Sequence, residues 1–88
     1  MDEWKKLLEA EASACGRICR VEAYEKPRGD RTLLLIAAEP IDQPGAGMHA
    51  AALTDPRKAS RLAEKAGENP EEALRRIALE DLVAAEGR

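Results

Sequence analysis

The spacing of apolar residues changes along the chain and divides it into segments of different period. Over residues 2–14, apolar side chains recur at intervals of three and four, which is the spacing of one face of an α-helix. Asp2 is a suitable N-cap, Glu3 suits the positive end of the helix dipole, and Gly16 is placed to end the helix. The pattern therefore predicts an N-terminal helix over about residues 2–14. Its apolar face would consist of Trp4, Leu7, Leu8, Ala12 and Cys15.

The next two segments have the pattern of β-strands. Residues 19–24 alternate between apolar and polar side chains, which is typical of a half-buried strand. Residues 27–30 form a Pro-Arg-Gly-Asp turn sequence, and residues 32–38 are mainly apolar without alternation, as in a central strand covered on both faces. We therefore expect a β-hairpin with a four-residue loop, with Leu35 and Ile36 both buried. The sheet face that packs on the N-terminal helix would hold Cys19, Val21, Ala23, Leu34 and Ile36.

The rest of the sequence predicts a loop, a further short element and two helices. Residues 39–47 contain two prolines and two glycines, which disfavour regular structure. Residues 48–54 fit either a third strand or a short helical turn, and we favour a strand beside the hairpin. Asp-Pro at 55–56 provides a cap and a first turn, and apolar residues then recur at helical spacing up to Gly67. Asn-Pro at 69–70 opens a second helix in the same way.

Together these elements predict a single small α+β domain spanning residues 1–88. It would be a small antiparallel sheet, made of the hairpin with or without a third strand, packed against an N-terminal helix and two C-terminal helices. An apolar fraction of 44% is sufficient for a core. With one Trp, one Tyr and no Phe, however, the chain has too few aromatic residues for an aromatic binding cleft.

The charges are dense but nearly balanced. Charged residues make up 35% of the chain and the formal net charge is −3, so this small acidic protein is not an obvious binder of nucleic acid or membranes. No apolar run approaches the length of a membrane span, and the first residues have no basic and apolar leader. We therefore expect a cytoplasmic location and no membrane partner.

The sequence offers little material for catalysis, metal binding or a cofactor. His49, Cys15 and Cys19 are three soft ligands, whereas structural zinc takes four at shorter paired spacings, so we expect no metal and two reduced cysteines in the core. Gly45 and Gly47 are not followed by the Lys-Ser or Lys-Thr of a phosphate-binding loop. No nucleophile has an evident activating base. We therefore expect a protein that is not an enzyme and holds no cofactor.

Charged side chains on the two predicted C-terminal helices are the best candidates for a functional surface. A basic stripe follows the first of these helices at intervals of four, and an acidic group surrounds the start of the second. Each also has a purely structural interpretation, as a solvated helix face or as helix capping. The candidate protein-binding residues are Arg57, Lys58, Arg61, Lys65, Glu68, Glu71 and Glu72.

These observations favour a protein-interaction module, a small regulator or inhibitor that acts by surface charge complementarity. In its small size, its acidic charge and its lack of an evident catalytic or metal site, the chain is similar to phage and mobile-element anti-defence proteins, such as anti-CRISPR proteins, and to antitoxins. The expected partner is another protein, and a protein that binds nucleic acid is one candidate. No motif in the chain identifies one of these families.

An alternative function is DNA binding by a small transcriptional regulator. Over about residues 57–77, Leu62-Ala63, Ala66-Gly67 and Leu74-Arg75-Arg76-Ile77 resemble the first helix, turn and second helix of a degenerate helix-turn-helix. The resemblance implies that the second helix would read DNA. Glu71 and Glu72 stand at its start, where carboxylates would meet phosphates and base edges with the wrong sign. Direct binding of nucleic acid is therefore the second choice.

Overall fold

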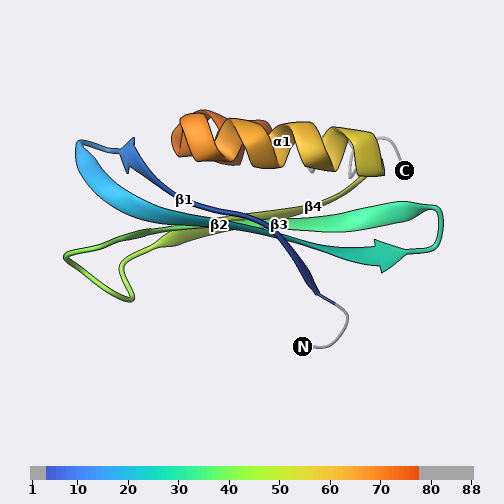
Figure 1. The fold of residues 1–88 in the computed structure, drawn as a ribbon, viewed down its shortest axis with the longest axis horizontal. Coiled ribbons are helices and arrows are strands. Elements are labelled where there is room, and N and C mark those ends of the chain that lie inside the picture. Colours follow the sequence, from blue (N-terminus) through green and yellow to red (C-terminus); the bar gives the residue numbers. More distant parts are fainter. Residues whose placement is uncertain (1–3, 78–88) are drawn as a thin grey trace.

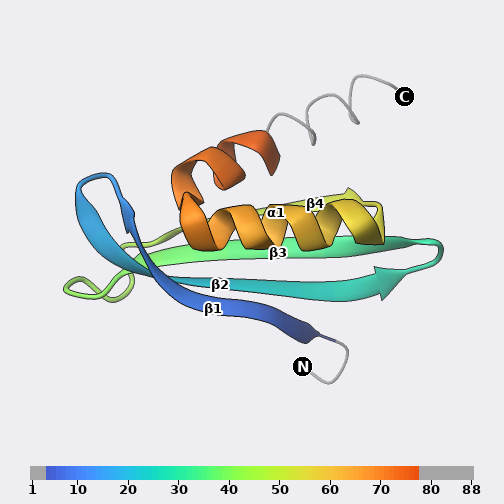
Figure 2. The ribbon, with the colours of Figure 1, turned by 45° about the horizontal axis from the view of Figure 1, so that its top comes forward.

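The computed structural model describes residues 4–77, which form an antiparallel sheet followed by two helical segments. The strands are β1 (Lys5–Ala14), β2 (Arg17–Arg28), β3 (Arg31–Pro40) and β4 (Met48–Thr54). They lie in the order β1-β2-β3-β4, each antiparallel to the next. Helix α1 (Pro56–Glu68) and a second helical segment, residues 70–77, lie on one face of this sheet (Figures 1 and 2). The α+β class is confirmed, with the sheet first and the helices after it.

The predicted N-terminal helix is wrong, because this segment is strand β1. Its helix-facing side chains alternate from Leu8 to Ala14, and a register shift between Lys6 and Leu8 interrupts the alternation. This β-bulge lets the adjacent residues Leu7 and Leu8 both pack against the core. Two consecutive core residues interrupt the alternation of a strand and make the sequence pattern resemble that of a helix. Sheet pairing with β2 therefore overrides the helix-favouring alanines of this segment.

The predicted hairpin is confirmed as β2 and β3, but with a different register. Arg28 pairs with Arg31, so the loop has two residues, Gly29 and Asp30, instead of four. Gly29 has a φ of 62°, a conformation that glycine adopts without strain. The shift of two residues leaves every side chain on its predicted face, because the side-chain period of a strand is two. The five residues predicted for the helix-facing side are accordingly all buried: Cys19, Val21, Ala23, Leu34 and Ile36.

Strand β3 is central in the sheet, as predicted, but the described residues cover only one of its faces. Its burial alternates along the strand, with Ile36 fully buried and Leu35 only partly buried. The expected burial of both is therefore confirmed for Ile36 and wrong for Leu35. Both helical segments lie on the Ile36 side of the sheet (Figure 1). The favoured third strand is confirmed as β4, which pairs with β3 along the whole of its length.

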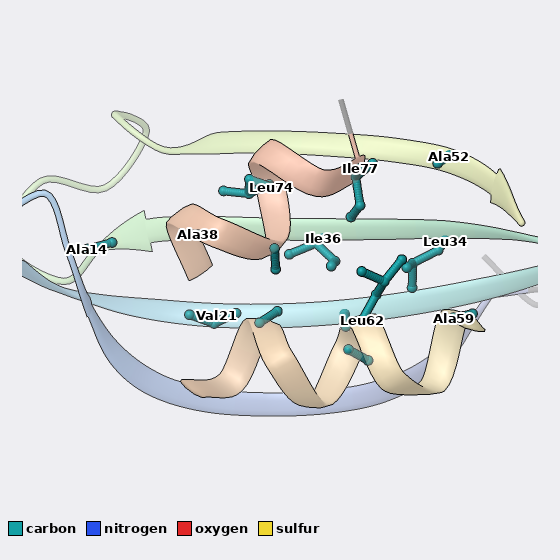
Figure 3. Close-up of a cluster of buried hydrophobic side chains, with 14 of the residues drawn as sticks. Ala14, Val21, Leu34, Ile36, Ala38, Ala52, Ala59, Leu62, Leu74 and Ile77 are labelled. Carbon is teal, nitrogen blue, oxygen red and sulfur yellow. The ribbon is translucent and has the colours of Figure 1, made fainter. Parts of the chain in front are cut away.

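Helix α1 lies close to the sheet because its buried face consists mainly of alanine. Ala59, Ala63 and Ala66 face the sheet together with Leu62, and residues 70–77 add their own apolar face from Ala73, Leu74 and Ile77. Figure 3 shows Val21, Leu34 and Ile36 pointing from the sheet toward these helices. Small and branched side chains from both layers fill this interface.

Both predicted helix starts have the expected caps. The Asp55 side chain accepts a hydrogen bond from the Arg57 backbone N–H at 2.8 Å. The Asn69 side chain accepts one from the Glu72 backbone N–H at 3.3 Å. These carboxylate and amide oxygens satisfy N–H groups that have no partner inside the helix. The first helix extends one residue past the predicted stop at Gly67, to Glu68.

The two cysteines occupy different environments, so the prediction that both lie in the core is wrong for one of them. Cys19 is buried, whereas Cys15 is exposed in the two-residue turn between β1 and β2. Cys15 has a φ of 52° and Gly16 a φ of 74°. Two consecutive positive φ angles are the signature of a type I′ turn, in which a non-glycine residue at the first position is strained unless it is Asn or Asp.

Replacing Cys15 with asparagine should therefore stabilise the fold. The change Cys15→Asn creates the Asn-Gly pair that type I′ turns prefer, and it removes no buried side chain. We expect the melting temperature to rise by a few degrees, as measured by circular dichroism. The matched control Cys15→Val places a β-branched residue at the same positive φ and should lower it. Equal melting temperatures for the two variants would contradict the turn assignment.

Candidate functional site

Three exposed basic side chains on the first half of α1 form the most distinctive charged feature among the described residues. The helix begins at Pro56 after its cap, so Arg57 and Lys58 lie in its first turn, and Arg61 follows one turn later. All three are exposed. We call Arg57, Lys58 and Arg61 the basic row.

The basic row lies at the end of the helix where positive charge is unfavourable. The N-terminus of a helix carries a partial positive charge, so basic residues there destabilise the helix, whereas acidic residues stabilise it. The first turn of α1 contains no acidic residue. Arg57 and Arg61 are also spaced i, i+4, at which like charges repel. The helix dipole and the repulsion between Arg57 and Arg61 therefore both disfavour these charges.

Lys65, the fourth predicted basic residue, belongs to the contact between the two helical segments. Its ammonium group lies 3.3 Å from a carboxylate oxygen of Glu72, and both side chains are only partly exposed. Its backbone carbonyl accepts a hydrogen bond from the Asn69 N–H at 2.7 Å, where the chain turns into the second segment. Lys65 thus has a structural role in the contact between the two helical segments.

The predicted acidic group is also engaged within the fold. A carboxylate oxygen of Glu71 accepts a hydrogen bond from the backbone N–H of Cys15, which joins the second helical segment to the β1–β2 turn. Glu72 pairs with Lys65 and, at 3.1 Å, with Arg76. Glu68 is exposed in the last turn of α1. The acidic group therefore has a structural role, because Glu71 and Glu72 make contacts within the fold.

These contacts lower the pKa of both carboxyl groups. The hydrogen bonds from Cys15 hold the pKa of Glu71 below its usual value. The hydrogen bond and positive charge of Lys65 do the same for the pKa of Glu72, with a smaller effect from Arg76. Both carboxylates are consequently charged at neutral pH, as is favourable near the N-terminus of a helix.

The candidate soft ligands do not form a metal site in the described part of the chain. No group of three or more His, Cys, Asp or Glu side chains converges there. The hydrogen bond and negative charge of Glu71 raise the pKa of the Cys15 thiol, which disfavours the thiolate form that binds metals and acts as a nucleophile. His49 lies on strand β4 and is exposed.

The segment that resembles a helix-turn-helix has a different connection. Asn69 alone joins α1 to residues 70–77, whereas the motif uses a turn of about three or four residues. The start of the second segment, which would have to enter a DNA groove, is in contact with the β1–β2 turn through Glu71. The geometry thus gives the DNA-binding alternative no added support.

Sequence reasoning missed one candidate surface, the sheet face opposite the helices, which we call the open face. At one of its ends is a hollow of about 430 Å³. The lining residues are Arg20, Glu22, Ala37, Glu39, Pro40, Ile41 and Pro44. The missing alternation in β3 was a signal for this surface, because it indicated apolar side chains on both faces of that strand.

Comparisons of this chain with known protein families, with curated proteins and with solved structures find no match. Within residues 4–77, no helix has the length and apolar character needed to cross a membrane.

Proposed function

We propose that this chain is a small, non-enzymatic protein-interaction module, a regulator or inhibitor that docks its basic row on an acidic surface of a partner protein. The observation that carries the proposal is the position of Arg57 and Lys58 in the first turn of α1, where they oppose the helix dipole. Charges kept at a position that disfavours the fold are best explained by a role outside the fold.

The energies involved are a measurable part of the stability of a small domain. A charge of the unfavourable sign in the first helical turn costs about 0.3–1 kcal/mol, and a like-charge pair at i, i+4 costs about 0.2–0.5 kcal/mol. A marginally stable domain would gain from acidic residues at these positions. The acids at the start of the second helical segment, Glu71 and Glu72, follow that rule and have partners inside the fold. Arg57 and Lys58 break it.

Reversing the basic row should abolish partner binding and leave the fold intact. The double variant Arg57→Glu/Arg61→Glu replaces two exposed charges on one helix face. We expect it to retain at most one tenth of the protein that the immobilised wild-type chain captures from an extract of the native host, as quantified by mass spectrometry. Its melting temperature should equal or exceed that of the wild type, because the new acids suit the helix dipole.

The matched control changes the net charge equally at a distance from the basic row. Lys5 is exposed on β1 and Arg75 is exposed on the second helical segment, so Lys5→Glu/Arg75→Glu introduces the same four units of negative charge. This control should capture the partner as the wild type does. Equal loss in both double variants would show a general effect of net charge, and capture undiminished by Arg57→Glu/Arg61→Glu would refute the proposal.

DNA binding is tested in the same series by a gel shift at low and moderate salt. The proposal predicts no sequence-specific complex with any of the variants or with the wild type. A tight, sequence-specific complex that is lost in Arg61→Glu/Lys65→Glu would instead support the transcriptional regulator.

A further inference from the structure

The open face carries an apolar centre flanked by Lys6 and Lys26, which lie opposite Tyr24 and Leu33. In the register of the sheet, Leu33 pairs with Leu53, and Leu35 pairs with both Tyr24 and Ala51. These side chains alternate with the buried ones, so they point away from the helices. Leu53 is 47% exposed, and no described segment covers this face (Figure 1). Solvent-facing positions of an antiparallel sheet are normally polar, so this centre is typical of an interface.

The charges on the open face are sorted by sign along the strands. Arg28 and Arg31 pair with each other at one end, beside the β2–β3 turn. Toward the other end, Glu39 pairs with Arg20, and Arg20 in turn pairs with Glu11. In the next outward-facing row toward the apolar centre, Glu22 of β2 lies opposite Glu9 of β1 in the strand register. Lys6 of β1 forms ion pairs with Glu9 and Glu22. This end therefore holds four carboxylates against Arg20 and Lys6 and is acidic overall, whereas the other end is basic.

The acidic end is also hollow. The hollow of about 430 Å³ lies there, and two carboxylates, Glu22 and Glu39, line it with one basic side chain, Arg20. The β2–β3 hairpin end, with Arg28 and Arg31, is its counterpart at the other end of the same strands. Along β3, Arg31 and Glu39 are each four residues from Leu35, so the two ends are equidistant from the middle of the apolar centre.

We propose that a second copy of this chain covers the open face, with the two sheets packed face to face. The two-fold axis lies between the sheets and runs perpendicular to the strands, at the level of Leu35. This axis reverses the strand direction between the copies. It places the basic hairpin end of each copy over the acidic hollow of the other, so that Arg31 faces Glu39 of its partner. The apolar centres meet at the axis, with Leu35 and Tyr24 opposite their own counterparts.

Charge complementarity selects both this occupant and this axis. A two-fold dimer brings one patch against itself, so a charge on this patch is stabilised when the opposite charge lies at the same distance on the other side of the axis, as Arg31 and Glu39 do. A two-fold axis parallel to the strands and above β3 would instead place Arg31 against Arg31 and Glu39 against Glu39. That arrangement is repulsive. The proposed one places Arg31 opposite Glu39 and Lys26 opposite Glu22 twice each, against two contacts between Arg28 and Arg20.

The open face is large enough for such an interface. Strands of ten residues, at about 3.4 Å per residue, and four strands about 4.8 Å apart give it an area on the order of 600 Å². Specific interfaces bury upwards of about 500 Å² per partner. In the dimer the helices would form the two outer layers, so each outer layer would present one basic row. The dimer does not depend on the function proposed for that row.

The mass of the isolated protein in solution tests this proposal without any partner. We expect sedimentation equilibrium to show a dimer with a Kd at or below about 10 µM. Leu53→Glu should raise this Kd at least tenfold, because it places a carboxylate in the apolar centre. The control Met48→Glu, at a residue 42% exposed near the start of β4 and on the other side of that strand, should leave the Kd unchanged.

A charge swap tests the direction of the axis. Arg31→Glu and Glu39→Arg should each weaken the dimer several-fold, and the double variant should restore it, because each copy then supplies both swapped charges. Glu39 also accepts a hydrogen bond from the Gly45 N–H at 3.1 Å, so circular dichroism must show that each variant is folded. A monomeric wild type, a dimer indifferent to Leu53→Glu, or a double variant weaker than both single ones would each overturn the proposal.

Discussion

Replacing Ile36 with alanine is expected to lower the free energy of unfolding by about 2–5 kcal/mol. Ile36 is fully buried in the central strand β3, beneath both helical segments (Figure 3). Truncating it removes three carbons from the contact between the sheet and the helices and leaves a cavity that the rigid strand cannot close. Small domains have about 5–15 kcal/mol of stability in total, so the variant should be close to unfolding.

Urea denaturation followed by circular dichroism measures this loss, with Ile18→Ala as the control. Ile18 has the same side chain on the neighbouring strand β2 but is 61% exposed, so its truncation should cost within about 0.5 kcal/mol. Equal losses for the two variants would contradict the one-sided core described here.

Enlarging Ala66 to leucine is expected to cost about 1–3 kcal/mol, the second largest effect on stability. Ala66 is fully buried on the face of α1 that packs on the sheet. The next residue, Gly67, is so close to β1 that a Cβ there would lie 3.0 Å from a methyl carbon of Leu8. The helix would have to move away from the sheet to admit three more carbons, and every contact along it would weaken.

The control for this variant is Ser60→Leu, on the exposed side of the same helix. It introduces the same side chain, which favours helix slightly more than serine does, without any packing conflict. Its urea midpoint should change little or rise. A leucine at position 66 that stabilises the protein as much as one at position 60 would show that the helix does not approach the sheet closely.

The parts of the fold that the sequence predicted correctly are those with two concurring signals. Asp55-Pro56 and Asn69-Pro70 each combine a capping side chain with a proline in the first turn, and both mark true helix starts. The faces of the hairpin were also predictable despite the wrong loop length. Period-two alternation determines which side chains share a face, whereas the register depends on how many residues the turn uses.

The N-terminal strand could not be predicted because its pattern fits two periods. Leu8 and Ala12 belong both to a helical stripe and to the alternating face of β1, and alanine itself favours helix. The bulge between Lys6 and Leu8 supplies the remaining agreement with a helix. Only the neighbouring strand β2, a tertiary contact, decides between the two periods.

The candidate site was predictable as a list of residues but not as a surface. The sequence places Arg57, Arg61 and Lys65 on one helix stripe, yet Lys65 contacts Glu72 across a helix connection that spacing does not reveal. In the same way, Glu71 binds the turn at Cys15, which is 56 residues away along the chain. Pairings across such distances are set by the fold, so only the structure could show that Lys65, Glu71 and Glu72 make contacts within it.

The most direct test of the central claim, that the basic row binds a partner by charge complementarity, is the association rate of the captured partner as a function of ionic strength. We predict that the rate falls steeply between about 0.01 and 1 M salt, as the screening length shrinks from about 30 to 3 Å. The slope should be much reduced for Arg57→Glu/Arg61→Glu and largely retained for Lys5→Glu/Arg75→Glu. A rate that ignores salt, and that is the same for the wild type and for Arg57→Glu/Arg61→Glu, would contradict the account.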